Sequence, residues 1–246
     1  MGKLFIVGLG PGGALDTTPR AEAALRESQV IIGYTKYIDL VRDRFPGKEL
    51  IDSAMTTEVY RCHVAEGRVR MGQTVAMVCS GDAGVYGMAG LLLQICAPYP
   101  QMEIEIIPGV TAATAGAALL GAPLTNDFAA VSLSTALTSW ETIERRLRAA
   151  AAGDFVICLY NPASRSRPDT LRRAAEVLLA ILPPQTPCGL ARNVSREGEE
   201  SWLCLLGELP GQRADMFTTV LVGNSQTRII NGRLVTPRGY EKKGEL

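Results

Sequence analysis

The sequence predicts an α/β protein of two domains, with a mostly parallel sheet in the N-terminal domain and a mixed sheet in the C-terminal domain. In the first half of the chain, apolar strand-like runs alternate with helical patterns, which is typical of parallel sheets covered by helices. In the second half, several strands follow one another, and turn residues at 121–128 separate the halves as a linker. The 246 residues, 47% of them hydrophobic, suffice for large buried cores.

The N-terminal domain is expected to span residues 1–122. Thr18 followed by Pro19 is a favourable helix start, because threonine can cap the first turn and proline suits the first helical position. Gly72 is suited to end the helix that precedes a buried strand. The expected elements are, in order, strand 3–8, helix 18–28, strand 29–33, helix 36–45, helix 56–71, strand 74–80, helix 85–97, strand 103–107 and helix 111–120.

The C-terminal domain is expected to span residues 123–246. One of its helices carries Ile143, Leu147 and Ala151 on a single face. Asn231-Gly232, between two short apolar runs, indicates a hairpin with a two-residue turn. The expected elements before that hairpin are strand 129–134, helix 139–152, strand 154–160, helix 168–182, and strands 187–194, 202–207 and 217–223.

Composition and charge exclude several classes of partner. Lys plus Arg and Asp plus Glu number 25 each, with no basic block, so neither nucleic acid nor an anionic membrane is expected as a partner. The chain has no apolar run of about eighteen residues and no secretory leader pattern, so a cytoplasmic protein is expected. The six cysteines form no C-x-x-C pair and His63 is the only histidine, which predicts reduced core thiols and no metal site.

The segment 74–90 is the most informative part of the sequence, because an apolar strand runs into a glycine-rich turn that opens a helix. Gly81, Gly84 and Gly87 lack Cβ atoms, so main-chain groups could approach a small molecule closely. A cofactor cradle at the carboxyl end of a parallel strand is one interpretation. A tight strand-to-helix connection without a ligand is the other.

The run from Gly8 to Gly13 satisfies the G-x-G-x-x-G pattern after a strand, which first suggests a dinucleotide. That interpretation needs an acidic residue at the end of the second strand, where the chain has Gly33-Tyr34-Thr35. Pro11 also removes an N–H from the loop that would face the pyrophosphate. A nucleotide-dependent oxidoreductase therefore stays only as an alternative, beside a non-catalytic carrier of a small molecule.

Five segments together resemble the tetrapyrrole (corrin and porphyrin) methyltransferases: VGLGPGG at the first strand, SGDAGVYGMAG, IPGVTAATA, GAPLTNDF and LYNPASRSR. The resemblance covers residues 3 to 224. It implies a two-domain α/β enzyme, usually a homodimer, that binds S-adenosylmethionine in a cleft between the domains and releases S-adenosylhomocysteine. The apolar helices expected at 85–97 and 111–120 also favour a dimer.

The GDAGVYGMAG and YNP-x-S-x-x-R forms resemble the branch of the family that acts in cobalamin biosynthesis. The implied reaction is methylation of carbon 17 of precorrin-3B with contraction of the macrocycle. The cobalt-bearing precursor of the anaerobic route is an equally open substrate. Methyl transfer from a sulfonium needs mainly alignment, whereas contraction needs a group that handles protons.

The resemblance also places residues at the sites. Those expected to contact the cofactor are Pro11, Gly81, Asp82, Ala83, Tyr86 at a helix start, Thr111, Ala112, Tyr160, Asn161 and Val194. The tetrapyrrole carries carboxylates, which arginine binds in bidentate geometry. The residues expected to bind it are Arg165, Arg167 and Lys36, with Arg20, Arg192 and Arg196 as further cations of the same rim. Each of these cations could equally be ordinary surface charge.

Three positions depart from the family pattern, each by loss of an ionisable side chain. They are Gly13 in the first loop, Asn126 in the linker, and Thr135 after Ser134. The proton-transfer group must then be another residue. The candidates, in order, are Asp127, Ser132 and His63, and ordinary turn or surface roles are the alternatives.

Overall fold

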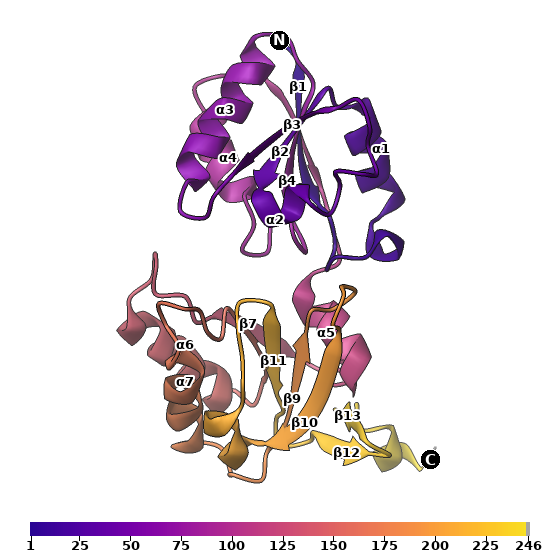
Figure 1. Ribbon diagram of the computed structural model, residues 1–246. Helices are drawn as coiled ribbons and strands as arrows, with labels where there is room; N and C mark the ends of the chain where they lie inside the picture. The colour runs from indigo at the N-terminus through magenta and orange to yellow at the C-terminus, as the bar shows by residue number, and fades with distance from the viewer. Residues whose placement is uncertain (245–246) are drawn as a thin grey trace. The chain divides into compact units, whose positions relative to one another are not determined.

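The computed structural model describes residues 1–244 and divides the chain into two units, Met1–Ala112 and Ala113–Leu246 (Figure 1). The division falls after the first residue of helix α5 (Ala112–Leu120), whereas the sequence-based boundary lies at 122. The helix joins the second unit because Ala113, Ala117 and Leu120 are buried in one of its clusters. Residues 121–128, expected to form a linker, also belong to the second unit.

The first unit contains the parallel sheet that the sequence predicts. Its strand order is β3-β2-β4-β1-β5, and every pairing is parallel. The bounds are β1 (Lys3–Gly8), β2 (Val30–Tyr34), β3 (Glu49–Ser53), β4 (Val75–Cys79) and β5 (Glu103–Ile107). The sequence analysis missed β3, an edge strand whose residues are all at least partly exposed, so it lacks a buried apolar run.

Helices cover both faces of this sheet (Figure 1). Helices α3 (Glu58–Arg70) and α4 (Ala89–Cys96) share one core cluster with Ile6 and Met77, whereas α1 (Pro19–Glu27) and α2 (Thr35–Ile38) lie on the other face with Val7 and Val78. The helix predicted over 36–45 is wrong beyond residue 38. The chain continues in turns such as Val41 N–H to Ile38 O at 3.0 Å, which bury the apolar residues without a continuous helix.

The second unit contains a mixed sheet, as predicted. Its order is β10-β9-β11-β8-β7, with only β7 and β8 parallel. The bounds are β7 (Phe128–Ser132), β8 (Val156–Tyr160), β9 (Pro187–Arg192), β10 (Glu200–Leu205) and β11 (Thr218–Val222). Helices α6 (Trp140–Ala152) and α7 (Thr170–Leu179) pack on one face and α5 on the other.

A small third sheet has the strand order β12-β13-β6. Its strands are β12 (Arg228–Ile230), β13 (Arg233–Val235) and β6 (Gly121–Ala122). The predicted hairpin is confirmed, because Asn231 and Gly232 both have positive φ, 48° and 73°, as a two-residue primed turn requires. The short 3-10 helices are η1 (Ala14–Asp16), η2 (Leu206–Gly211) and η3 (Tyr240–Lys243). Within residues 1–244, no helix has the length and apolar character of a membrane span.

Candidate active site

Three loops meet at the carboxyl edge of the first sheet, after the adjacent strands β4, β1 and β5. The chain leaves β1 toward β2 on one side and leaves β4 toward β5 on the other, so the strand order reverses at this point. Ligands of open α/β sheets bind at such positions. The order also differs from the dinucleotide-binding order, since β4 separates β1 from β2.

Two glycines join the first two loops through their backbones. Gly10 N–H donates to Gly81 O at 3.0 Å, and Gly81 N–H donates to Gly10 O at 2.7 Å. Both residues have positive φ, 80° and 67°, a conformation that strongly favours glycine. The glycine pattern of each loop therefore serves the pairing of the loops as well as any ligand.

Asp82 ties the second loop to the third. Its Oδ1 accepts from the amides of Gly84 at 2.7 Å and Val85 at 3.1 Å, and its Oδ2 accepts from the Gly109 amide at 3.0 Å. Bonds from three amides therefore occupy both carboxylate oxygens. Asp82 shapes the loop in this way, as the aspartate of an Asx turn does. A direct contact of Asp82 with the cofactor remains a prediction.

The glycines of the 81–87 loop differ in what surrounds them. A Cβ at Gly87 would lie 2.4 Å from Ala83 O, so that glycine serves local packing, contrary to the expectation that it leaves room for a ligand. A Cβ at Gly81 would be 3.7 Å from Ala112 N, against the start of α5. A Cβ at Gly84 would meet only one atom within 4 Å, Asp82 Oδ1, and the contact would be tight at 3.3 Å.

The remaining predicted cofactor residues of the first unit have mixed surroundings. Tyr86 does not start a helix, since α4 begins only at Ala89; it is 54% exposed and has φ of 54°. Ala83 is buried in the core beneath the loop, and Pro11 is buried as well. Thr111 and Ala112 do precede and begin α5 as predicted, where the first amides of a helix lack partners within the helix.

In the second unit, Ser132, Tyr160 and Asn161 are brought together where β7 and β8 end, and Ser132 pairs with Tyr160 in the sheet. Tyr160 Oη accepts from the Ala113 amide at 3.0 Å and so holds the first turn of α5. Asn161 has φ of 53°, and its Nδ2 donates to Ser132 Oγ at 3.0 Å. Ser132 Oγ also accepts from the Ser134 amide at 3.3 Å, which leaves its own proton to donate.

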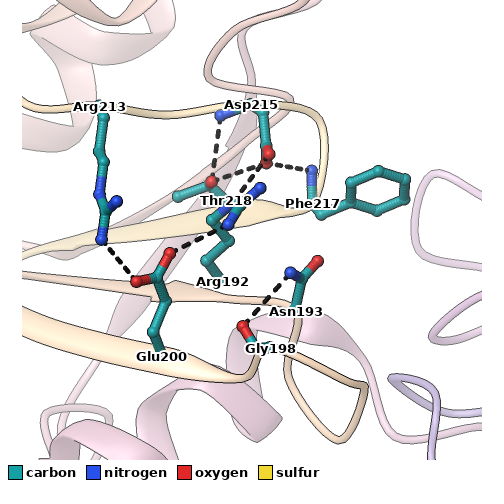
Figure 2. A network of polar contacts seen from close by, with 8 residues as sticks. All are labelled: Arg192, Asn193, Gly198, Glu200, Arg213, Asp215, Phe217 and Thr218. Atoms are coloured by element: carbon teal, nitrogen blue, oxygen red, sulfur yellow. Dashed lines mark hydrogen bonds and ion pairs between the residues drawn. The ribbon is translucent and has the colours of Figure 1, made fainter.

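A polar network lies at the end of β9 (Figure 2), and Val194 is in the turn that follows this strand. Arg192 Nε contacts Asp215 Oδ2 at 2.8 Å and its Nη1 contacts Glu200 at 3.0 Å, while Arg213 pairs with the other oxygen of Glu200 at 2.5 Å. Arg192 is thereby committed to two carboxylates and is not a spare cation for a substrate. Val194 itself is only 8% exposed and belongs to a core cluster, which favours a packing role for its side chain.

The network also shifts the pKa values of Asp215 and Arg192. Burial would raise the pKa of Asp215, but the bonds from Arg192, the Phe217 amide and the Thr218 hydroxyl bring that pKa below its ordinary value. The pKa of Arg192 is raised by Asp215 first and then by Glu200. Both groups are therefore charged at neutral pH.

The three candidates for proton transfer come from different parts of the chain. Asp127 precedes β7 and is exposed, whereas Ser132 ends the same strand, so the two lie about 16 Å apart along it. His63 is on α3 of the first unit, its side chain 60% exposed and its Nδ1 4.0 Å from Glu66. Within the second unit, Ser132 lies beside Tyr160 and Asn161, whereas Asp127 is at the start of β7.

The predicted substrate cations are not equivalent. Lys36 is 60% exposed and 4.0 Å from Asp39, Arg20 pairs with Glu105 at 3.0 Å, and Arg165 is exposed. Arg167 differs because its Nη1 is buried and has no hydrogen-bond partner. Its backbone is fixed by two bonds with Ser164, at 3.0 and 3.2 Å.

Sequence analysis missed Arg61, a second arginine with an unpartnered buried nitrogen. Its position in the periodic pattern of α3 could have identified it from the sequence. Arg61 falls on the same buried face as Cys62, Ala65 and Val69, where an apolar residue is the norm.

The six cysteines are free and buried, as the sequence predicts. Burial raises the pKa of Cys62 to about 12, that of Cys79 to about 11 and that of Cys158 to about 12, so these thiols stay protonated. Among residues 1–244, no three His, Cys, Asp or Glu side chains gather as ligands for one metal ion.

Comparison with known proteins agrees with this fold. The family of Tetrapyrrole (Corrin/Porphyrin) Methylases matches residues 3–210. The chain is 43% identical over 238 residues to a probable cobalt-factor III C(17)-methyltransferase of Salmonella typhimurium, across 96% of this chain and 99% of that protein. It is 42% identical over 248 residues to a precorrin-3B C(17)-methyltransferase of Sinorhizobium sp., across 97% of each. The crystal structure of the methyltransferase CobJ aligns with a TM-score of 0.89 and 38% identity, over 96% of this chain and 100% of that one. The chain therefore belongs to the tetrapyrrole (corrin/porphyrin) methylases.

Proposed function

We propose that this protein transfers a methyl group from S-adenosylmethionine to carbon 17 of a cobalamin precursor, either precorrin-3B or cobalt-factor III. The observation that carries the proposal is the near-complete alignment with C(17)-methyltransferases of both kinds, at 43% and 42% identity. Since these two identities are nearly equal, the choice between the metal-free and the cobalt-bearing tetrapyrrole is left to experiment. The relatives give no support to an oxidoreductase or a carrier.

The loops of the first unit support a cofactor role. Three features suit a small ligand with a carboxylate and a flat base: the absence of a side chain at exposed Gly84, the amides at the start of α5, and the position at a reversal of strand order. The proposed contacts there remain Pro11, Gly81, Asp82, Ala83, Tyr86, Thr111 and Ala112. Tyr160, Asn161 and Val194 are the proposed contacts of the second unit.

For the tetrapyrrole, Arg167 is the strongest of the predicted anchors, because a buried guanidinium nitrogen without an acceptor is costly unless a ligand supplies one. Arg167→Ala should raise the Kd for the tetrapyrrole about tenfold to hundredfold, the loss of one charge-assisted bond, and leave the affinity for S-adenosylhomocysteine unchanged. Absorbance titration and calorimetry measure the two affinities. Arg165→Ala is the matched control on the same loop, and equal effects of both variants would speak for general surface charge.

For ring contraction, we propose Ser132 as the hydrogen-bond donor, since its oxygen already accepts two bonds and its proton is available. Ser132→Ala should then give a product that has gained one methyl group but keeps the spectrum of the uncontracted macrocycle. Asp127→Asn serves as the comparison, because Asp127 lies at the far end of β7. Contraction that proceeds normally in Ser132→Ala excludes this role.

The test of the function itself is incubation with S-adenosylmethionine and either precorrin-3B or cobalt-factor III, under anaerobic conditions for the latter. Mass spectrometry should detect the gain of one methyl group, and the visible spectrum should record contraction. At one hundred times its Kd, S-adenosylhomocysteine should add about 2.7 kcal/mol to the free energy of unfolding and so raise the melting temperature. NAD should change neither quantity. No methyl gain on either tetrapyrrole would falsify the proposal.

We also propose a homodimer, on the family resemblance and on apolar side chains that stay exposed, such as Leu93 of α4 and Leu119 of α5. Sedimentation at micromolar concentration tests the proposal, and a monomer there counts against it.

A further inference from the structure

Arg61 is a buried cation whose charge the protein does not fully match. The residue lies in the first turn of α3 and is only 4% exposed. Its Nε is buried and has no hydrogen-bond partner. Its Nη2 reaches Ala54 O at 3.4 Å, a long bond, and the carboxylate of Glu58 at 3.8 Å. Glu58 is itself 45% exposed and accepts from the Thr56 amide, so it is a weak partner.

The other arginines of the same helix show what a satisfied guanidinium looks like here. Arg68 contacts both oxygens of Glu49, at 2.6 and 3.1 Å, and Arg70 bonds Glu66 at 3.1 Å. Both are more exposed than Arg61, so their charges are also solvated. The residue with the greatest need of an anion is therefore the one that lacks a close carboxylate.

Two buried side-chain nitrogen or oxygen atoms lack a partner in the described part of the chain, Nε of Arg61 and Nη1 of Arg167. Both belong to guanidinium groups, and native proteins leave few buried donors unpaired. Removing a charge from water is unfavourable unless an opposite charge and hydrogen bonds compensate it. Because both unpartnered donors belong to positively charged side chains, an anion is the kind of ligand that would complete each of them.

The position of Arg61 is compatible with such a ligand. Ala54 directly follows β3, and α3 begins four residues later, so Arg61 is at the carboxyl edge of the first sheet. Cys79 ends β4, which is separated from β3 by β2. Burial raises the pKa of Cys79, and the Met88 amide and then the Arg61 charge oppose that rise. The 80–88 loop leaves the sheet from Cys79, so the guanidinium lies at the edge that carries the proposed cofactor loops.

We infer that Arg61 binds a carboxylate of a bound ligand and so positions that ligand at the edge of the first sheet. The inference rests on the proposed function for the identity of the ligands. Two ligands of the proposed reaction carry a carboxylate: the tetrapyrrole, on its acidic side chains, and S-adenosylmethionine, at its amino-acid end. A planar guanidinium whose Nε and terminal nitrogen point the same way suits bidentate contact with either.

The test compares Arg61→Met and Arg61→Lys with Arg70→Met, a control on the same helix. Methionine fills a similar volume without the charge, and lysine keeps the charge without Nε. Three quantities are measured on the full chain: the melting temperature without ligand, the Kd for S-adenosylhomocysteine by calorimetry, and the Kd for precorrin-3B or cobalt-factor III by absorbance titration. Binding is measured without turnover, so failure of methyl transfer would leave this test intact.

Arg61→Met should melt no lower than the wild type without ligand, because it removes an unmatched buried charge. It should weaken one ligand about tenfold to hundredfold, and the ligand affected identifies the source of the carboxylate. Arg61→Lys should show a smaller loss for the same ligand, and Arg70→Met none.

An Arg61→Met variant that melts lower while both affinities stay unchanged would show a purely structural arginine and overturn the inference. If Arg61→Met does not fold, Arg61→Lys decides. Wild-type affinity of that variant for both ligands overturns the inference, and a loss for one ligand only supports it.

Discussion

At the scale of single residues, neighbouring glycines of the 81–87 loop do different things. A Cβ at Gly84 would meet only Asp82 Oδ1, at 3.3 Å, so a larger side chain there would occupy ligand volume and require only a small shift of this carboxylate. Gly84→Val should therefore keep the melting temperature of the wild type and bind S-adenosylhomocysteine at least about tenfold more weakly, since even one lost close contact is worth about 1 kcal/mol or more.

The matched control is Gly90→Val, on the exposed side of α4, where a Cβ would meet nothing within 4 Å. It should bind the cofactor product normally. Gly87→Val, whose Cβ would approach Ala83 O to 2.4 Å, should instead lose stability. Calorimetry and thermal melting separate the three, and normal affinity in a folded Gly84→Val would remove this loop position from the site.

The sequence predicted where the glycine-rich loops lie better than it predicted which partners the polar side chains bond. The glycine-rich loops were recognisable because left-handed backbone restricts residue choice, as at Gly10 and Gly81. The partners of Asp82 and Arg192 were not, because their bonds join loops and strands distant in sequence: Gly109 is 27 positions from Asp82, and Asp215 is 23 positions from Arg192. Arg61 could have been found from its place on the buried face of its helix.

At the scale of elements, the start of α5 depends on a side chain from the end of β8. Tyr160→Phe removes the oxygen that accepts from the Ala113 amide and leaves that N–H unpaired. We expect a loss of about 1 to 3 kcal/mol in the free energy of unfolding. We also expect weaker binding of S-adenosylhomocysteine, because Thr111 and Ala112 are proposed to contact it.

Denaturant unfolding and calorimetry check this pair of effects. Tyr60→Phe, at a position 65% exposed, is the control for loss of a tyrosine hydroxyl and should change neither quantity. A Tyr160→Phe variant as stable as the wild type would show that water replaces the bond.

Elements with a clear period or a cap were predictable. The start of α1 is an example: Thr18 Oγ1 accepts from the Ala21 amide at 3.1 Å, and Pro19 follows the cap. The turns over 39–45 were not predictable, because buried Ile38, Val41 and Phe45 have helical spacing although helix α2 stops at 38. β6 was not predictable either, since two residues of strand depend on pairing with Leu234 and Val235 far along the chain.

At the scale of the whole molecule, part of the stability depends on pH through Asp215. Its pKa in the folded state lies below its ordinary value, so the unfolded chain takes up the proton first as the pH falls. The stabilisation is therefore complete above about pH 4, the ordinary range of an aspartate, and is lost as the pH falls through the folded pKa.

Asp215→Asn should be less stable than the wild type at pH 7, and the difference should shrink as the pH falls below about 4. Urea unfolding at a series of pH values measures this. Glu176→Gln, which removes an exposed ion pair with Arg172 at 2.9 Å, should change stability little at any pH. A constant difference between Asp215→Asn and the wild type across the series would contradict the assignment.

The reciprocal amide bonds between Gly10 and Gly81 constrain how this scaffold can be engineered. A loop taken from a relative with a different specificity brings its own backbone path, and its partner must follow that path to keep both bonds. Segments 8–13 and 80–88 should therefore be exchanged together when chimeras are built. A library that varies only one of them would consist largely of proteins in which the donor and acceptor no longer meet.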